Sequence, residues 1–378
     1  MNQRINSLSE YHFKKIDDLK ENLKASGKSY TDLSIGDPDL PLNENIRNEL
    51  LYRIGLNAYN NYPPYDGITL LKDKIIDHYS KIYNVRLNRN QVLILIGSKE
   101  GLNNLIPAVC DFNDVVIAPD LGYPVYSKCS LLWGCQSYKM KLNEKNDYLP
   151  EIHNIPKNIL EKSKLMFINY PNNPTGSIGN PVYIKEIIKL CKNNEIILCN
   201  DSAYMDIVSS DENSMSLLQY DKDLEFIEMG SFSKTFNMTG LRIGFAVGSE
   251  SIINNLAKIK NNVDSGQYVP IQYAAVEALN IYEDYIKEIR GIYDERRNTA
   301  YEMLDENQLE YYKGKGTFYI WCKCPNEMKC NEYVEWLIKE KSVIVTPGIC
   351  FGEDYDDYFR IALTKEKEEI RKALKSLK

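Results

Sequence analysis

One lysine in this sequence is flanked by hydroxyl side chains and followed by an arginine. Lys234 comes directly after Ser233 and three residues after Ser231, and Arg242 follows it eight residues later. A lysine in desolvated surroundings can have a lowered pKa, and its neutral amine then forms Schiff bases with carbonyl groups. Two hydroxyls and a guanidinium are suited to hold a phosphate monoester. This segment therefore indicates a reactive amine beside a phosphate site.

Three further polar segments follow predicted strands, and each has a structural alternative. Asp201 follows a buried strand, where an isolated helix cap would also explain an aspartate. Ser98, with Lys99 after it, opens a helix either as a phosphate-binding serine or as a plain N-cap beside an exposed lysine. Asn173 lies in an Asn-Asn-Pro-Thr-Gly segment that could be an ordinary turn. A lysine, a phosphate site and an aspartate from another strand together suit pyridoxal phosphate, whose pyridine nitrogen needs an acidic partner.

These segments lie in a stretch of chain that alternates short apolar runs with helical patterns. Most of the runs are rich in β-branched residues and are followed by Gly, Asn, Asp, Pro or Ser. An amphipathic helix is predicted at 181–193, since apolar residues recur at helical spacing from Ile184 to Cys191. Alternating strands and helices favour a mostly parallel sheet, which binds ligands at the carboxyl ends of its strands. The predicted strands are 92–96, 115–118, 165–169, 196–200, 226–230 and 243–247.

The pattern changes after residue 250, where a smaller α+β unit is predicted. Its predicted elements are amphipathic helices at about 252–262 and 271–307, strands at 316–321 and 343–347, and a Lys/Glu-rich helix at 365–378. The N-terminal residues hold one helix at about 11–25 and an extended piece at 33–37, which are too short for a domain. We therefore expect a large domain of residues 40–270 and a small domain formed by 1–39 and 271–378.

The composition of the chain excludes several classes of protein. Lys and Arg number 46 against 53 Asp and Glu, so the net charge is −7 and no basic field attracts nucleic acid or anionic membranes. No apolar run is long enough to cross a bilayer and the N-terminus lacks an apolar signal region, so a cytoplasmic protein is expected. Nine cysteines do not suggest a disulfide framework, and with only three histidines neither a metal site nor a histidine-based triad is expected.

The segment 231–244 resembles the cofactor-lysine signature of the class I/II aminotransferases of fold type I. Seven segments of that family occur in its order along essentially the whole chain. They contain Tyr62, Ser98 with Lys99, Asn173, Asp201 with Tyr204, Lys234, Arg242 and Arg360. The resemblance implies an α/β fold in which a large domain with a mostly parallel seven-stranded sheet carries a smaller α+β domain. It also implies pyridoxal 5'-phosphate as the cofactor of an aminotransferase.

The resemblance implies roles for individual residues. Lys234 would bind the cofactor aldehyde and move a proton, while Asp201 would keep the pyridine nitrogen protonated. The other implied cofactor residues are Tyr204 and Asn173 at the ring oxygen, Tyr123 stacked on the ring, Ser98, Lys99, Ser231, Ser233 and Arg242 on the phosphate side, and Tyr62 from a second subunit. Gly36 and Arg360 would bind the substrate α-carboxylate, the arginine through a planar contact that a lysine could not copy. A homodimer acting on amino acids and 2-oxo acids is implied.

Within the family, four phrases resemble the branch of aminotransferases that act on LL-diaminopimelate in lysine biosynthesis, with 2-oxoglutarate as the acceptor. The phrases are residues 34–41, 96–101, 121–126 and 262–266. The implied substrate-side residues are Tyr11, Lys99, Tyr123, Asn173 and Asn262, and Asp66 is a candidate partner for a distal ammonium. Leu241 stands where the family usually has tryptophan, and the segment 207–218 departs from the branch pattern.

Three other functions stay open beside this one. A broad-specificity aspartate or aromatic aminotransferase would use the same fold and cofactor residues. A C–S β-lyase would also share them and differ only in the group that leaves after proton removal. A non-catalytic regulator would need an added DNA-binding module, for which the residues before Leu33 and the acidic composition give no support.

Overall fold

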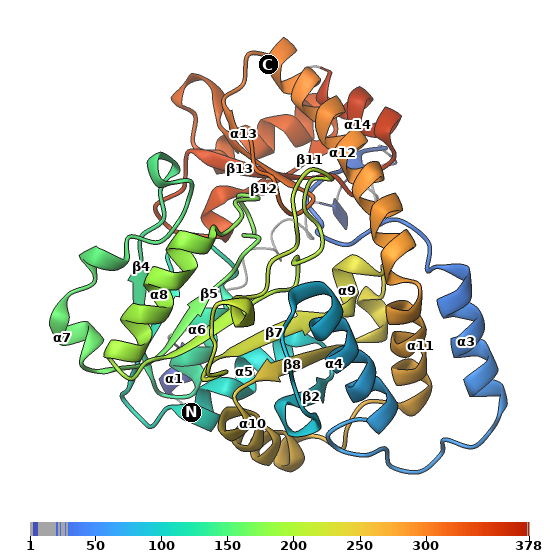
Figure 1. Ribbon diagram of the computed structural model, residues 1–378. Helices are drawn as coiled ribbons and strands as arrows, with labels where there is room; N and C mark the ends of the chain where they lie inside the picture. Colours follow the sequence, from blue (N-terminus) through green and yellow to red (C-terminus); the bar gives the residue numbers. More distant parts are fainter. Residues whose placement is uncertain are drawn as a thin grey trace.

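The computed structural model describes residues 3–6, 20–21, 23, 27, 29–375 and 377. The chain forms a larger part around one wide sheet and a smaller part, at the top of Figure 1, around narrower sheets. The helix predicted at about 11–25 falls mostly outside the described residues. Within those residues, no helix combines the length and the apolar character that a membrane crossing requires.

Seven strands form the large sheet in the order β2-β8-β7-β6-β5-β3-β4. They are β2 (Val92–Leu95), β3 (Val115–Pro119), β4 (Gln136–Met140), β5 (Ser163–Ile168), β6 (Ile197–Asp201), β7 (Ile227–Ser231) and β8 (Gly244–Gly248). Strand β8 is antiparallel to both of its neighbours, and all other pairs are parallel. The mostly parallel seven-stranded sheet implied by the resemblance is thus confirmed.

Strand β4 is absent from the six strands that the apolar runs predict. It lies at the edge of the sheet beside β3, and its Gln136 and Lys139 are exposed. An edge strand that meets solvent does not need the continuous apolar run of a strand buried on both faces. The sequence therefore carried no signal for it.

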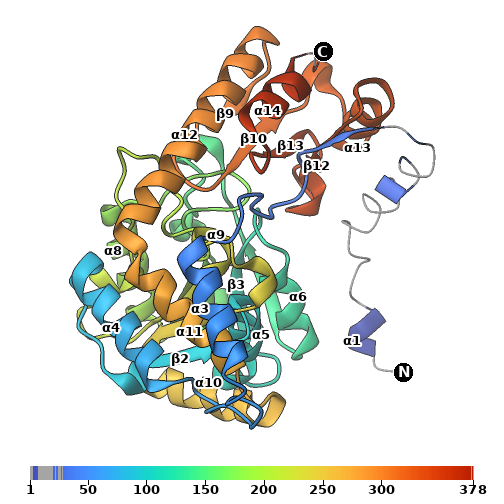
Figure 2. The ribbon, with the colours of Figure 1, turned by 90° about the vertical axis from the view of Figure 1, so that its right-hand side faces the viewer.

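Helices cover both faces of the large sheet (Figures 1 and 2). Helices α5, α6 and α10 pack on the face that presents Phe167 and Ala246. The opposite face presents Met166 to α8 and Ile94 to α4, because successive strand residues point to opposite sides. The helices of this part are α3 (Glu44–Gly55), α4 (Thr69–Tyr83), α5 (Ser98–Val109), α6 (Val125–Leu132), α7 (Lys157–Leu160), α8 (Pro181–Asn193), α9 (Phe232–Thr235), α10 (Glu250–Val263) and α11 (Val269–Asn280), and α1 (Gln3–Asn6) lies near α6.

Helix α8 has the bounds that the apolar periodicity predicts. The side chain of Asn180 accepts a hydrogen bond from the Tyr183 backbone N–H and caps the first turn, where Pro181 fits without losing a donor. Ile184 and Ile187 are buried against the sheet. Local capping and amphipathic burial therefore agree on this helix.

The smaller part contains a four-stranded antiparallel sheet in the order β12-β13-β10-β9 and a parallel pair, β1 with β11. Its elements are β1 (Thr31–Asp32), β9 (Tyr311–Tyr312), β10 (Tyr319–Lys323), β11 (Val343–Ile344), β12 (Thr346–Pro347), β13 (Tyr358–Ala362), α12 (Tyr282–Glu306), α13 (Cys330–Trp336) and α14 (Lys367–Leu374). The predicted helix at 271–307 is two helices, since the chain leaves helical geometry at Ile281 between α11 and α12. The division at 39/40 and 270/271 stays a prediction.

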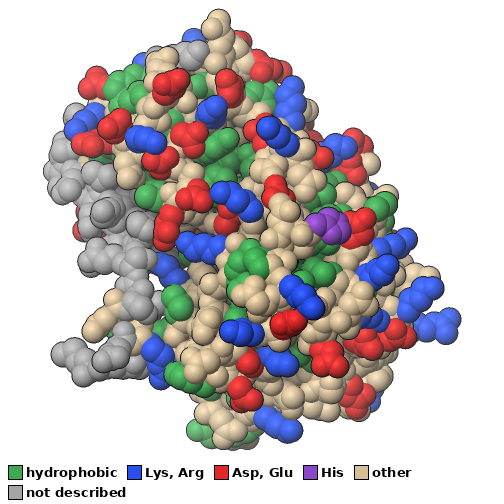
Figure 3. Space-filling view, turned by 90° about the vertical axis from the view of Figure 1, so that its left-hand side faces the viewer, with side chains coloured by type: hydrophobic (Ala, Val, Ile, Leu, Met, Phe, Trp, Pro, Cys, Tyr) green, Lys and Arg blue, Asp and Glu red, His purple; other side chains and the backbone are tan. Residues whose placement is uncertain are grey.

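One apolar cluster extends through both parts of the molecule. Phe245 of the large sheet, Phe318 before β10 and Ile361 of β13 all belong to it. Shared burial of this kind holds the smaller part over the carboxyl ends of the parallel strands. On the outer face shown in Figure 3, basic and acidic side chains are intermingled.

Candidate active site

A cavity of about 350 Å³ lies between the two parts, at the carboxyl ends of β5, β6 and β7. This is where open parallel sheets bind ligands. Twelve of the residues predicted from the sequence line it: Gly36, Ser98, Lys99, Tyr123, Asn173, Asp201, Tyr204, Ser231, Ser233, Lys234, Arg242 and Arg360. The structure therefore gathers residues that are spread over more than 300 positions of the sequence.

Lys234 enters the cavity from α9, the short helix that joins β7 to β8. Its Nζ donates a hydrogen bond of 2.5 Å to the backbone oxygen of Gly36. Burial lowers the pKa of Lys234 to about 8; the carboxylate of Asp37 opposes this change, and the cations of Arg360 and Arg242 add to it. The neutral fraction of the amine near neutral pH is therefore far larger than at the ordinary pKa of 10.5, which favours Lys234 as a nucleophile and base.

Asp201 is the last residue of β6, and its side chain is buried. Tyr126 donates a hydrogen bond of 2.8 Å to Oδ2, and the Ala203 backbone N–H donates one of 3.3 Å to Oδ1. Burial raises the pKa of Asp201 to about 6, and these two bonds oppose the rise. The helix-cap alternative fails because turns, not a helix, follow this residue. A buried carboxylate that accepts from two donors among the described residues fits a cationic ring nitrogen.

The groups expected to hold a phosphate meet at the N-terminus of α5. Gly97, not Ser98, occupies the N-cap position, and no side chain caps this helix. The plain N-cap alternative for Ser98 is therefore wrong, and the first N–H groups of α5 are available to an anion. Gly97 has φ 79°, and a Cβ there would lie 2.5 Å from Nη2 of Arg242. The close approach of Gly97 to the guanidinium forms a cradle that fits a phosphate.

Arg360 reaches the cavity from β13 and is 3% exposed. Its Nη1 donates to Oδ1 of Asn173 at 2.8 Å, and its Nη2 donates to the Ser34 backbone oxygen at 2.7 Å. The guanidinium lies 3.9 Å from the ring centroid of Tyr319. Among the described residues no carboxylate lies within ion-pair distance of Arg360, and its Nε has no partner. A buried cation with neutral partners alone fits an anionic substrate group.

The Asn-Asn-Pro-Thr-Gly segment forms a turn and also lines the cavity. Oδ1 of Asn172 accepts from the backbone N–H and the hydroxyl of Thr175, which makes the turn. Asn173 instead turns its side chain toward Arg360. Asn172 therefore stabilises the turn, and Asn173 contributes its side chain to the cavity.

Several lining residues were not found from the sequence. Tyr123 lies just before α6 and Tyr126 lies in its first turn, so the start of this helix brings both to the cavity. Their closeness in sequence could have revealed Tyr126. The hydroxyl of Tyr319 lies 2.8 Å from that of Tyr204, and a Cβ on Gly36 would lie 1.7 Å from it. No local pattern reports this contact, because it joins β10 to two distant segments.

Three described residues that were predicted for the site do not line the cavity. Tyr62 is 82% exposed. Asp66 forms an ion pair of 2.6 Å with Lys72. Asn262 lies on α10 and donates to the Lys258 backbone oxygen. Tyr11 lies outside the described residues, so its role stays a prediction.

A reactive lysine, a buried aspartate and an anion cradle at the carboxyl edge of this sheet define a pyridoxal phosphate enzyme of fold type I. The model of the family "Aminotransferase class I and II" matches residues 28–377. The chain belongs to this family, and it is a pyridoxal phosphate-dependent aminotransferase.

Relatives and solved structures match nearly the whole chain. The LL-diaminopimelate aminotransferase of Natranaerobius thermophilus is 40% identical over 99% of this chain and 97% of its own. The enzyme of that name from Moorella thermoacetica is 36% identical over 100% and 97%. Substrate-bound BacF from Bacillus subtilis superposes with a TM-score of 0.94 at 31% identity over 99% and 96%. The aspartate aminotransferase of Thermotoga maritima gives 0.92 at 25% identity over 99% and 98%.

The lowered pKa of Lys234 can be measured on the cofactor-free protein. We expect acylation of the Lys234 amine, followed by peptide mass spectrometry, to show a midpoint near pH 8. Asp37→Asn should move this midpoint lower, because it removes an anion that stabilises the ammonium form. The surface change Arg47→Gln should leave it in place. A midpoint at the ordinary value of 10.5 would contradict the proposed electrostatics.

The bond from Tyr126 to Asp201 gives a pH-dependent prediction. Tyr126→Phe should lower the free energy of unfolding of the cofactor-free protein by about 1–3 kcal/mol at pH 8, since a buried carboxylate loses a donor. The loss should shrink below pH 6, where Asp201 is protonated. Urea unfolding at pH 5 and 8 measures both values, and Tyr138→Phe on the edge strand β4 is the matched control. An equal loss of unfolding free energy at pH 5 and pH 8 would contradict a role for the ionised Asp201 carboxylate.

Proposed function

We propose that this aminotransferase transfers an amino group between LL-diaminopimelate and 2-oxoglutarate, as a step of lysine biosynthesis. The observation that carries the proposal is the 35–40% identity, over nearly the full chain, to several relatives named LL-diaminopimelate aminotransferase. This substrate has an amino-acid group at each end. The cavity offers a cation for each carboxylate, with Arg360 buried inside and Lys99 exposed at the rim.

The fit to the cofactor rests on the chemistry of the groups around the cavity. Bound pyridoxal phosphate supplies an aldehyde that takes up the amino group and a ring that accepts electrons when the substrate α-carbon loses a proton. Asp201 would pair with the ring nitrogen and keep it protonated. Tyr204 and Asn173 would donate to the ring oxygen, and Tyr123 would cover the ring. The N-terminus of α5, with the other predicted phosphate ligands Ser98, Ser231, Ser233 and Arg242, would hold the phosphate.

Lys234 and Arg360 would act on the substrate. With a pKa near 8, the amine of Lys234 would take a proton from the substrate α-carbon and deliver it to the carbon that the cofactor aldehyde supplies. Arg360 would bind the α-carboxylate, and Asn173 and Ser34 hold its guanidinium in one orientation. Fixing the carboxylate at one place sets the α-carbon relative to Lys234.

A broad-specificity aspartate aminotransferase is the second candidate. The similarity to the Thermotoga maritima enzyme favours this function, because that enzyme has the same fold and is named an aspartate aminotransferase. Arg360 would serve either substrate equally. The rim therefore has to distinguish the two functions, since only the longer substrate has a distal ammonium and carboxylate.

A homodimer is part of the proposal. Exposed apolar side chains occur on α3 and in the loop after it. Helix α3 lies toward the viewer in Figure 2. The exposed members are Leu51, Tyr52, Ile54, Leu56, Tyr62 and Tyr65. A patch of this kind on a folded surface favours a protein partner. A second copy of the chain would cover this patch. Tyr62 of each subunit would then lie beside the phosphate cradle of the other subunit.

The substrate assignment predicts a clear preference among amino donors. With 2-oxoglutarate as acceptor, kcat/KM for LL-diaminopimelate should exceed that for aspartate or phenylalanine by about 10–100-fold, the worth of one charge-assisted hydrogen bond. Lys99→Met should lower the ratio of kcat/KM for LL-diaminopimelate to that for aspartate by about tenfold. Lys234→Ala is the inactive control and should yield no borohydride-trapped cofactor peptide. Equal turnover of aspartate would favour the broad-specificity enzyme.

Subunit mixing tests the placement of Tyr62. Tyr62→Phe and Lys234→Ala subunits, each impaired alone, should recover activity when mixed, because one site of each mixed dimer then has both native residues. If Tyr62 served its own subunit, no mixed dimer would contain a native site and activity would not return. Sedimentation velocity before and after mixing checks that dimers are present, and an active monomer would refute the proposal.

A further inference from the structure

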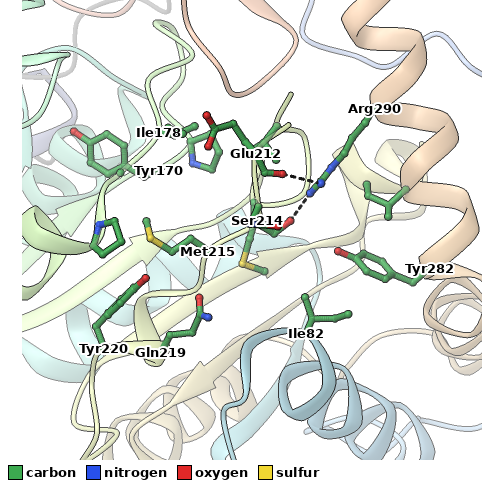
Figure 4. A pocket seen from close by; sticks show the side chains of 17 residues that line it. Ile82, Tyr170, Ile178, Glu212, Ser214, Met215, Gln219, Tyr220, Tyr282 and Arg290 are labelled. Carbon is green, nitrogen blue, oxygen red and sulfur yellow. Dashed lines mark hydrogen bonds between the residues drawn. The ribbon is translucent and has the colours of Figure 1, made fainter. Parts of the chain in front are cut away.

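A second cavity of about 570 Å³ lies outside the active site, and the two share no lining residue. It is formed by the loop after β5, the segment 205–220, and parts of α4, α8 and α12 (Figure 4). Its size falls within the range of about 300–1,000 Å³ typical of small-molecule sites. The segment 207–218 supplies part of its wall, with Val208, Glu212, Asn213, Ser214 and Met215 among the lining residues.

Apolar and aromatic side chains form one part of the walls of this second cavity, and polar groups form the rest. Met215 faces the interior in Figure 4, with Ile82 and Tyr282 at one side and Tyr170 and Tyr220 at the other. The tyrosine hydroxyls of Tyr170 and Tyr282 are already used, since they donate to the Tyr148 backbone oxygen and to Asp206. These walls offer rings and thioethers to an apolar body.

Arg290 is the cation of the second cavity, and it reaches in from α12 (Figure 4). Its Nε donates to the Asp206 backbone oxygen, its Nη1 to the Glu212 backbone oxygen and its Nη2 to the hydroxyl of Ser214, at 2.9, 3.2 and 2.6 Å. Every one of these acceptors is neutral. Of the five N–H donors of a guanidinium, two stay available in the described structure.

The acidic groups near Arg290 already have partners. The carboxylate of Glu212 pairs with Lys315. The buried carboxylate of Asp206 accepts from the hydroxyls of Tyr83, Ser214, Thr235 and Tyr282. None of the ion pairs among the described residues involves Arg290. Of the two charged residues that line the cavity, Glu212 is therefore paired and Arg290 has no ion pair among the described residues.

The same contacts fix the wall in place before any ligand binds. Ser214 accepts from Arg290 and donates to Asp206. These hydrogen bonds connect the wall of the cavity to α12 and to the segment that follows β6. Gln219 accepts from the Ser216 backbone N–H, and the Ser216 hydroxyl donates to buried Glu228. A preformed wall spares a ligand the ordering cost of binding.

We propose that this cavity binds an amphipathic monocarboxylate, with the carboxylate on the free N–H groups of Arg290 and the apolar body between Met215, Ile286 and the tyrosines. A two-point contact to a carboxylate is the geometry for which a guanidinium is suited. The site is independent of the amino-acid substrate, since it lies outside the active-site cavity.

Isothermal titration calorimetry on the holoenzyme tests whether the second cavity binds a carboxylate. The probe is 4-phenylbutyrate, and excess 2-oxoglutarate is present to occupy the active site. We expect one probe per chain and at least about tenfold weaker binding of 4-phenylbutylamine and 4-phenylbutanol, which share the ring but lack the anion. Arg290→Gln should raise the Kd at least about tenfold, because the carboxylate then loses its cation.

A second variant separates the site from the fold. Met215→Trp fills the cavity and leaves Arg290 and its three bonds intact, and it too should raise the Kd at least about tenfold while the transaminase activity is retained. Arg371→Gln on α14 is the matched arginine control and should bind the probe normally. The proposal is overturned by no binding at millimolar probe, by equal binding of the amine, or by an unchanged Kd in Met215→Trp.

Discussion

The buried guanidinium of Arg360 has only neutral partners, and this unbalanced charge is the constraint on which the site depends. A cation taken out of water without a counter-charge is unfavourable unless its hydrogen bonds are nearly complete. Asn173 and Ser34 supply two acceptors, and the rings of Tyr319 and Phe351 lie against its faces. These contacts hold the charge in place without neutralising it, so a substrate carboxylate meets a cation that is already oriented.

The same charge acts on Lys234. Burial, Arg360 and Arg242 together favour its neutral amine, while Asp37 opposes them. Burial also favours the neutral form of Asp201 at the other end of the cavity. The cavity therefore contains a base and an acid whose pKa values approach each other, at about 8 and about 6. A shift of the pKa values of titratable groups toward neutrality is typical of sites for proton transfer.

The chain between Tyr204 and Ser214 serves two cavities. Tyr204 faces the active site and meets Tyr319, whereas Met205 and Ser214 face the second cavity. Between them, Asp206 gathers hydroxyls from four elements, including Thr235 beside the reactive lysine. One buried carboxylate thus links α4 and α9 to α12. These hydrogen bonds hold the segment after Tyr204 in place.

The sequence by itself determined the residues that lie next to one another in a motif, together with the helices and strands of strong periodicity. The spacing of Lys234, the serines before it and Arg242 was enough to indicate an amine beside a phosphate site, and apolar spacing located α8. Only the tertiary structure decided what depends on contact between distant segments. It placed Tyr126 on Asp201 and Tyr319 beside Gly36, excluded Asp66 and Asn262 from the cavity, and brought the loop at 212–215 against Arg290. The physical reason is that local pattern records which face of an element is apolar, whereas burial and hydrogen bonding in a site are set by elements that meet across the fold.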